Sequence, residues 1–145
     1  MELALEAAAL AGRLLLAAVL GFVVGLEREY RGKAAGLRTF ALIALGCATF
    51  TALALDRFPI SGDRVIQGVA AGIGFLGAGI IFQREEGIVE GLTTAASIWS
   101  VAAMGVLIGA SSYLAGIFVT LLTVAILEID RLPLLRGIKR PMSEE

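Results

Sequence analysis

Three glutamates in one short segment are the side chains best suited to attract a metal cation. They are Glu85, Glu86 and Glu90, and long apolar runs lie on either side of them. Magnesium keeps several of its waters and is usually held by one or two carboxylates, so this segment could attract Mg²⁺ at the mouth of a membrane passage, as ligand or as transported ion. A solvated loop would carry the same acidic residues without binding a metal. The three glutamates are therefore weak candidates for a metal site.

A second polar set flanks the ends of the apolar runs and is expected to meet in space. It comprises Glu27, Arg28, Arg38, Thr39, Thr93 and Thr94. Arg38 begins an apolar run, where a cation opposes the dipole of a helix N-terminus. It should therefore pair with a carboxylate, for which Glu27 is the candidate, or bind an anion or a lipid phosphate. An ordinary surface pair with Arg31, four residues away, is the alternative role for Glu27.

Arg13 is the one ionisable residue that lies clearly inside an apolar run. A charge at membrane depth costs roughly 3 kcal/mol or more, so it needs a partner or water. The side chain either points into a helix bundle, where it would have a function, or snorkels to the outer interface. Ala17, Gly21 and Gly25 continue its spacing of four residues, which predicts a face that packs closely on a neighbouring helix.

The apolar run before the glutamates is unusually rich in glycine. Its five glycines are Gly68, Gly72, Gly74, Gly77 and Gly79, and Gly91 follows the glutamates. A glycine costs up to about 1 kcal/mol relative to alanine in a helix interior, so five of them need a reason. They could allow close helix packing through Gly68 and Gly72. Alternatively, the helix could unwind or kink from Gly72 to Gly79 and present backbone carbonyls to an ion or an anionic group.

Several kinds of chemistry are excluded by the composition. The chain has no histidine, which excludes catalytic triads and histidine metal sites. No nucleophile–base arrangement is visible, and the glycine-rich run lacks the lysine and the strand context of a phosphate-binding loop. The formal net charge is −1, so nucleic acid is not an expected partner. Cys47, the single cysteine, is expected to be a small buried residue. We therefore expect neither an enzyme nor a bound cofactor.

Membrane-spanning helices must position these residues. Hydrophobic residues make up 58% of the chain, above the roughly 45–50% of soluble domains, and the charges bunch between long uncharged stretches. A soluble bundle would need polar stripes that these runs lack. The apolar runs predict five spans, at residues 10–26, 39–55, 65–82, 92–108 and 113–127. The expected fold class is all-α, a polytopic membrane helical bundle, with a transmembrane domain at 1–130 and a short cytoplasmic tail at 131–145.

In each of the last two predicted spans, four residues that are mostly small or hydroxyl-bearing share one helix face. They are Thr93, Ser97, Ser100 and Met104 in one span, and Ser112, Gly116, Thr120 and Thr123 in the other. Hydroxyl groups at such positions usually join helices to one another, and a polar pathway is the alternative.

The basic residues predict the orientation in the membrane. Most of them lie after the first and third spans or in the tail: Arg28, Arg31, Lys33, Arg38, Arg84, Arg131, Arg136, Lys139 and Arg140. The loop after the second span holds only Arg57 and Arg64. By the positive-inside rule, the N-terminus should lie outside and the C-terminus in the cytoplasm. The polar set around Glu27 and Arg38 should then face the cytoplasm.

Three blocks of the sequence resemble the membrane domain of the MgtC/SapB family. They are LGFVVGLEREYRGKAAGLRTFALIALG, GIGFLGAGIIF and GLTTAASIWSVAAMGVLIGA, and their order and separation also fit. The matching motif positions are Glu27, Arg28, Gly36, Leu37, Arg38 and Thr39 in the first block, and Gly74, Gly77, Gly79, Gly91, Leu92, Thr94, Ala95, Ala96 and Trp99 in the others. Many members also carry a soluble cytoplasmic domain. The chain is expected to be a short form without it, with regulation absent or supplied by another protein.

The resemblance implies a bacterial inner-membrane protein that is linked to growth under magnesium limitation and, in pathogens, to survival within host cells. It also implies modulation of the proton-translocating ATP synthase through membrane contacts. Two functions stay open on this basis. One is a non-enzymatic factor that regulates a membrane partner such as a membrane subunit of that synthase. The other is a transporter or channel for magnesium or another ion or small solute. A homo-oligomer in the lipid bilayer is expected in either case.

Overall fold

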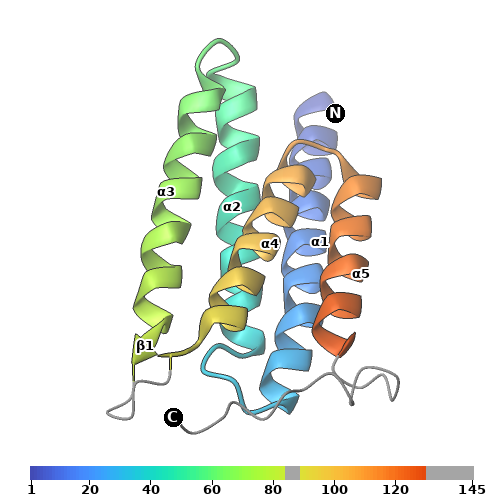
Figure 1. Cartoon of the computed structure of the whole chain (residues 1–145). Helices are drawn as coiled ribbons and strands as arrows, with labels where there is room; N and C mark the ends of the chain where they lie inside the picture. Colours follow the sequence, from blue (N-terminus) through green and yellow to red (C-terminus); the bar gives the residue numbers. More distant parts are fainter. Residues whose placement is uncertain (84–88, 130–145) are drawn as a thin grey trace, which may run out of the picture.

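The computed structural model describes residues 1–83 and 89–129 of the chain. Within them lie five helices and one pair of short strands: α1 (Glu2–Tyr30), α2 (Leu37–Arg57), α3 (Gly62–Ile80), β1 (Phe82–Gln83), β2 (Val89–Glu90), α4 (Leu92–Gly109) and α5 (Tyr113–Glu128). The five helices run up and down as a bundle (Figure 1), and β1 pairs with β2 in antiparallel register. The predicted all-α membrane bundle is confirmed. The predicted tail, residues 131–145, and the candidates Glu85 and Glu86 lie outside the described residues.

The helices differ in how well they suit a membrane. In the described part of the chain, α1, α2 and α4 are long and apolar enough to cross it, with mean hydropathy of 2.2, 1.7 and 1.6. Helix α5 is apolar but has 16 residues, which at 1.5 Å each make about 24 Å, somewhat less than a hydrocarbon layer of about 30 Å. Helix α3 carries Asp63 and Arg64 in its first turn, and it is not among the described helices that are long and apolar enough to cross a membrane.

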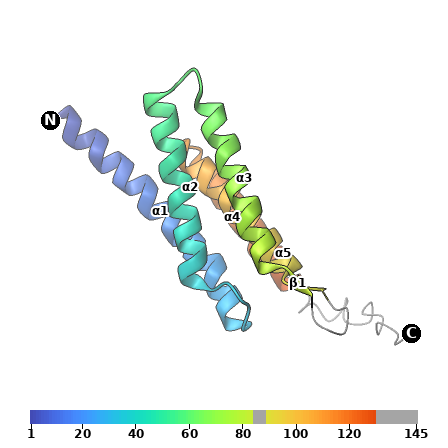
Figure 2. The same cartoon turned by 90° about the vertical axis from the view of Figure 1, so that its left-hand side faces the viewer.

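Helix α1 packs on α2 through the small residues that the sequence predicts. Ala17 is fully buried, and a Cβ atom on Gly21 would lie 2.5 Å from the carbonyl oxygen of Phe40. A Cβ on Gly25 would lie 2.5 Å from the Cα of Leu37. The predicted close-packing face of α1 is therefore confirmed. The N-terminal part of α1 is exposed, and Figure 2 shows it leaning away from the other helices.

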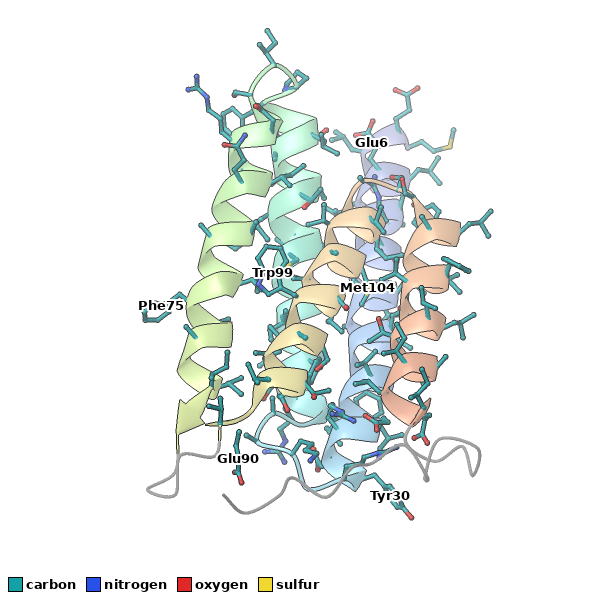
Figure 3. The ribbon with its side chains drawn as sticks, in the orientation of Figure 1. Glu6, Tyr30, Phe75, Glu90, Trp99 and Met104 are labelled. Atoms are coloured by element: carbon teal, nitrogen blue, oxygen red, sulfur yellow. The ribbon has the colours of Figure 1, made fainter. Side chains whose placement is uncertain are left out.

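Helix α4 lies against α1, α2, α3 and α5 and forms the centre of the bundle. Its Gly105 and Gly109 approach α2 closely, since Cβ atoms there would lie 2.7 Å and 2.5 Å from the carbonyl oxygens of Ala44 and Ala48. Its Ile98, Met104 and Ile108 are completely buried. The core of the protein is thus built around α4, as Figure 3 shows for Met104, which projects toward α1 and α5.

The glycines of α3 neither unwind the helix nor pack closely on another helix of the chain, as the two interpretations of the sequence had proposed. It runs unbroken from Gly62 to Ile80, so the proposed unwinding at Gly72–Gly79 is wrong. A Cβ on Gly68 or Gly72 would meet no atom within 4 Å, so these glycines do not pack closely within the chain either. The same holds for Gly74 and Gly79, whereas Gly77 would touch the Cβ of Ala95 at 3.7 Å. The described glycine face of α3 is therefore largely uncovered.

Candidate functional site

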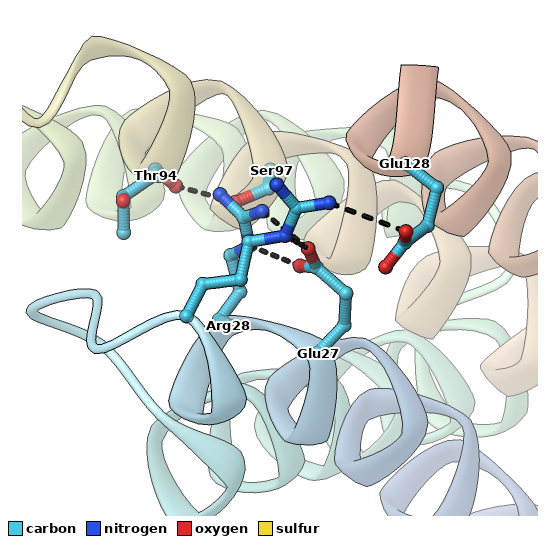
Figure 4. Close-up of polar contacts among 6 residues, drawn as sticks. Glu27, Arg28, Thr94, Ser97 and Glu128 are labelled. Carbon is cyan, nitrogen blue, oxygen red and sulfur yellow. Dashed lines mark hydrogen bonds and ion pairs between the residues drawn. The ribbon is translucent and has the colours of Figure 1, made fainter. Parts of the chain in front are cut away.

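Two glutamates and two arginines form a charged cluster where the C-terminal ends of α1 and α5 meet (Figure 4). Arg28 donates hydrogen bonds to both carboxylate oxygens of Glu27, the one from Nη2 to Oε1 being 2.7 Å long. Arg31 Nε lies 2.6 Å from the same oxygen of Glu27, and its Nη2 lies 3.2 Å from Glu128 Oε2. Arg31 therefore bridges the two helices, and we call these four residues the charged cluster.

The charged cluster is mostly withdrawn from solvent. Arg28 is 2% exposed as a residue, and the side chain of Glu27 is 8% exposed. Buried charges are costly unless they are paired, and removing one partner of such a pair leaves the other uncompensated. Two glutamates balance two arginines, so the cluster carries no net charge.

Local sequence explains how the charged cluster forms. Glu27 and Arg31 are four residues apart, which places them on one face of α1. Arg28 lies in the last turn of α1, where a cation is favoured by the helix dipole. Its guanidinium group points toward the first turns of α4, where Thr94 and Ser97 lie (Figure 4). The cluster thus joins α1 to α5 beside the start of α4.

The structure brings together only part of the polar set predicted from the sequence. Glu27, Arg28 and Thr94 lie close to one another and are buried or partly buried, whereas Arg38, Thr39 and Thr93 are exposed. The predicted pair of Glu27 with Arg38 is wrong, because Arg28 and Arg31 on the same helix occupy the Glu27 carboxylate. The pair of Glu27 with Arg31 does form, but it is mostly buried and does not lie on the surface.

Two acidic residues of the charged region were not singled out by sequence reasoning. Glu128 lies far along the chain from Arg31, and no spacing pattern relates them. Glu29 accepts a hydrogen bond of 3.0 Å from the backbone N–H of Leu37 and so satisfies a free donor at the start of α2. An acidic residue shortly before a predicted helix start is a signal that could have identified Glu29. Gly36 fits beside this carboxylate because it has no side chain.

Gly91 occupies the joint between α3 and α4. Its φ of +90° lies in the left-handed region, which glycine adopts without strain. A Cβ there would also collide with the carbonyl oxygen of Ile80, the last residue of α3. The backbone oxygen of Gly91 accepts the first hydrogen bond of α4, 2.8 Å from the N–H of Ala95. Gly91 is therefore required by the backbone.

Arg13 points into the bundle, as one of the two predictions proposed. Its Nη1 donates to the carbonyl oxygen of Gly109 at 3.5 Å, near the C-terminal end of α4, where a cation is favourable. Its Nε is buried and has no hydrogen-bond partner among the described residues. Thr51, which packs against Gly109, likewise has a buried hydroxyl without a partner in this part of the chain. Gly109 is the last residue of α4, so the alternative of snorkelling to the outer interface stays a prediction.

Three hydroxyl groups of α4 and α5 donate hydrogen bonds to carbonyls of their own helices. Ser97 donates to the carbonyl of Thr94 at 2.8 Å, and Thr120 and Thr123 donate to carbonyls one turn earlier in α5. The prediction of hydrogen bonds between helices is therefore wrong for these three hydroxyls. The alternative of a polar pathway stays a prediction.

Of the three glutamates predicted as metal candidates, Glu90 lies among the described residues. Across residues 1–83 and 89–129, no three acidic, cysteine or histidine side chains lie close enough together to hold a metal ion. Glu90 is partly buried and has a polar partner of its own. The chemistry that this region does offer is ion pairing between helices.

Comparisons with known proteins give several relatives. The chain is 44% identical over 126 residues to "Putative magnesium transporter YhiD" of Escherichia coli K12, which covers 81% of this chain and 58% of that protein. It is 45% identical over 130 residues to protein SrpB of Synechococcus elongatus, covering 78% and 71%. It is 46% identical over 100 residues to protein MgtC of Salmonella typhimurium, covering 69% and 43%. The chain thus spans about half the length of YhiD and MgtC.

The comparison with solved structures found no match. The family model described as the MgtC family matches residues 14–132, which include most of α1 and all of α2 to α5. The match covers well over half of the chain, and it includes Glu27, Arg28, Arg31 and Glu128. This protein therefore belongs to the MgtC family.

Proposed function

We propose that this protein is a non-enzymatic factor of the bacterial inner membrane that supports growth under magnesium limitation by regulating a membrane partner. The charged cluster is the observation that carries this proposal. Its carboxylates are occupied by guanidinium groups, so a cation would have to displace Arg28 and Arg31 to bind there. Magnesium, which gives up its waters reluctantly, is poorly suited to do so. A charged cluster that is neutral within itself and joins two helices suits a protein that acts through helix contacts.

The candidate partner is a membrane subunit of the proton-translocating ATP synthase, as the family resemblance implies. Helix α5 offers a surface for such contact, because Leu114, Phe118 and Leu121 are exposed on it. In a bilayer these side chains would touch either lipid or the helices of another protein. We expect the factor to work as a homo-oligomer and, in a pathogen, to support survival within host cells.

Site-specific crosslinking tests the proposed partner. A photoreactive benzoylphenylalanine replaces Phe118 on α5 in one variant and Phe58, at the end of α2, in a control variant. In cells grown at limiting magnesium, the Phe118 variant should form an adduct with the synthase subunit, and the Phe58 variant should not. Adducts that contain only lipid or a second copy of the chain would contradict this partner.

Transport of magnesium is the second candidate, and the printed name of the Escherichia coli relative favours it. The purified protein would be placed in liposomes that hold a magnesium indicator, with Arg38→Ala and Gly77→Leu as variants. Saturable uptake that is lost in both variants would establish transport. The absence of uptake, with a membrane potential and a proton gradient applied, would support regulation.

A further inference from the structure

An open groove of about 740 Å³ lies between α2 and α3. Its walls are formed by Leu42, Gly46 and Phe50 of α2 and by Gly68, Gly72 and Leu76 of α3. The remaining lining residues are also apolar, apart from the Thr39 hydroxyl at one end and the buried Cys47 thiol. Ordered water needs two to four polar partners, which this lining does not provide. In a membrane the groove must therefore be filled by hydrocarbon or by another helix.

The groove exists because glycines stand where larger side chains would fill it. Cβ atoms on Gly46, Gly68 and Gly72 would meet nothing within 4 Å. Three such glycines facing one space leave the groove open between the two helices. Along α2 the groove runs from Thr39 to Phe50, which is about 16 Å at 1.5 Å per residue. This length matches half of a hydrocarbon core of about 30 Å, the depth of a single leaflet.

A cation marks one end of the groove. Arg38 is next to Thr39 and one helical turn before Leu42, so it lies at the edge of the face that lines the groove. Arg38 is exposed, and it forms no ion pair with a carboxylate of residues 1–83 or 89–129. Because it stands in the first turn of α2, it opposes the helix dipole and would be stabilised by an anion.

We propose that this groove holds one anionic phospholipid, with an acyl chain between α2 and α3 and the phosphate against Arg38 and the Thr39 hydroxyl. A phospholipid combines a chain of leaflet length with a negative charge at one end, which is the arrangement that the groove and Arg38 complement. The lipid would belong to the leaflet on the side of the charged cluster. This inference does not depend on the proposed regulatory role.

Native mass spectrometry of the whole chain tests the proposal. The protein is equilibrated in mild detergent with phosphatidylglycerol and with phosphatidylethanolamine of identical acyl chains, and the lipid retained is measured. The wild type should retain one phosphatidylglycerol in preference to phosphatidylethanolamine. Gly72→Leu fills the groove and should lower retention of both lipids about tenfold or more. Arg38→Gln removes the charge-assisted contact and should reduce the preference for phosphatidylglycerol about tenfold.

Matched controls separate the groove from general effects of substitution. Gly74→Leu changes a glycine of the same helix that also has open space but does not line the groove, and it should retain lipid like the wild type. Arg64→Gln removes an exposed cation at the other end of α3 and should keep the preference. Equal loss in Gly72→Leu and Gly74→Leu would overturn the proposal. So would a dimer that retains no lipid and dissociates in Gly72→Leu, because the groove would then hold a second copy.

Discussion

Glycines serve opposite purposes in the two halves of this bundle. In the half formed by α1, α2 and α4, Gly21 and Gly109 bring backbones so close that no side chain would fit. In α3, Gly68 and Gly72 face open space. The first pair lets helices touch, whereas the second pair keeps a surface hollow. Glycine at helical spacing in a membrane helix therefore indicates a small surface, and only the neighbouring helix determines whether that surface is covered.

Breaking the charged cluster should give the largest loss of stability in the tightly packed half. Glu27→Gln should lower the free energy of unfolding by roughly 3–5 kcal/mol, because it leaves Arg28 buried without a charge partner. Unfolding by denaturant in detergent micelles, followed by circular dichroism, measures this change. Glu6→Gln, on the exposed start of α1, is the control and should have no effect. An unchanged midpoint in Glu27→Gln would show that α1 and α5 do not depend on the cluster.

Adding one methyl group to α1 tests the close packing of the first half. Gly21→Ala should destabilise the protein by roughly 1–3 kcal/mol, since the new Cβ would overlap Phe40 and force α1 from α2. The same micelle unfolding measures it. The control is Gly12→Ala, on the same helix, where the Cβ meets nothing within 4 Å. If both variants unfold alike, the close approach of α1 to α2 is not important for stability.

The joint at Gly91 tests the connection between the two halves. Gly91→Ala requires a non-glycine residue at positive φ beside the Ile80 carbonyl, which should cost roughly 1–3 kcal/mol. Hydrogen exchange at the start of α4 should then become faster, relative to Gly32→Ala, which also has positive φ but has open space around it. Unchanged exchange at Ala95 in Gly91→Ala would contradict this explanation, because its N–H makes the first hydrogen bond of α4.

The smallest expected effect is a gain in stability. Gly74→Ala on α3 should raise the free energy of unfolding by up to about 1 kcal/mol, because alanine favours the helix and no atom obstructs it. The thermal midpoint in micelles measures the change. Gly105→Ala on α4 should instead lower the midpoint, because its Cβ would lie 2.7 Å from the carbonyl oxygen of Ala44. A loss of stability in Gly74→Ala would mean that this face of α3 is covered in the folded protein.

Sequence predicted the helices well and their contacts only in part. Hydropathy and charge spacing locate five helices, since each is a property of a continuous segment. Local spacing also identified the Glu27–Arg31 pair and the close-packing face of Gly21. It could not identify Glu128 as a partner of Arg31, because that contact joins distant segments. It also could not distinguish Gly72 from Gly109, since the difference lies in the helix opposite each glycine.

The connection between α3 and α4 has a practical consequence for protein engineering. Gly91 rests on the end of α3, and β1 pairs with β2, so the two helices are fastened together at their adjoining ends. Contacts on both sides of the residues between Gln83 and Val89 therefore set the relative placement of the two helices. Extra residues inserted there should leave the bundle unchanged. This position is consequently suited to an epitope or a fluorescent reporter that reveals which side of the membrane it faces.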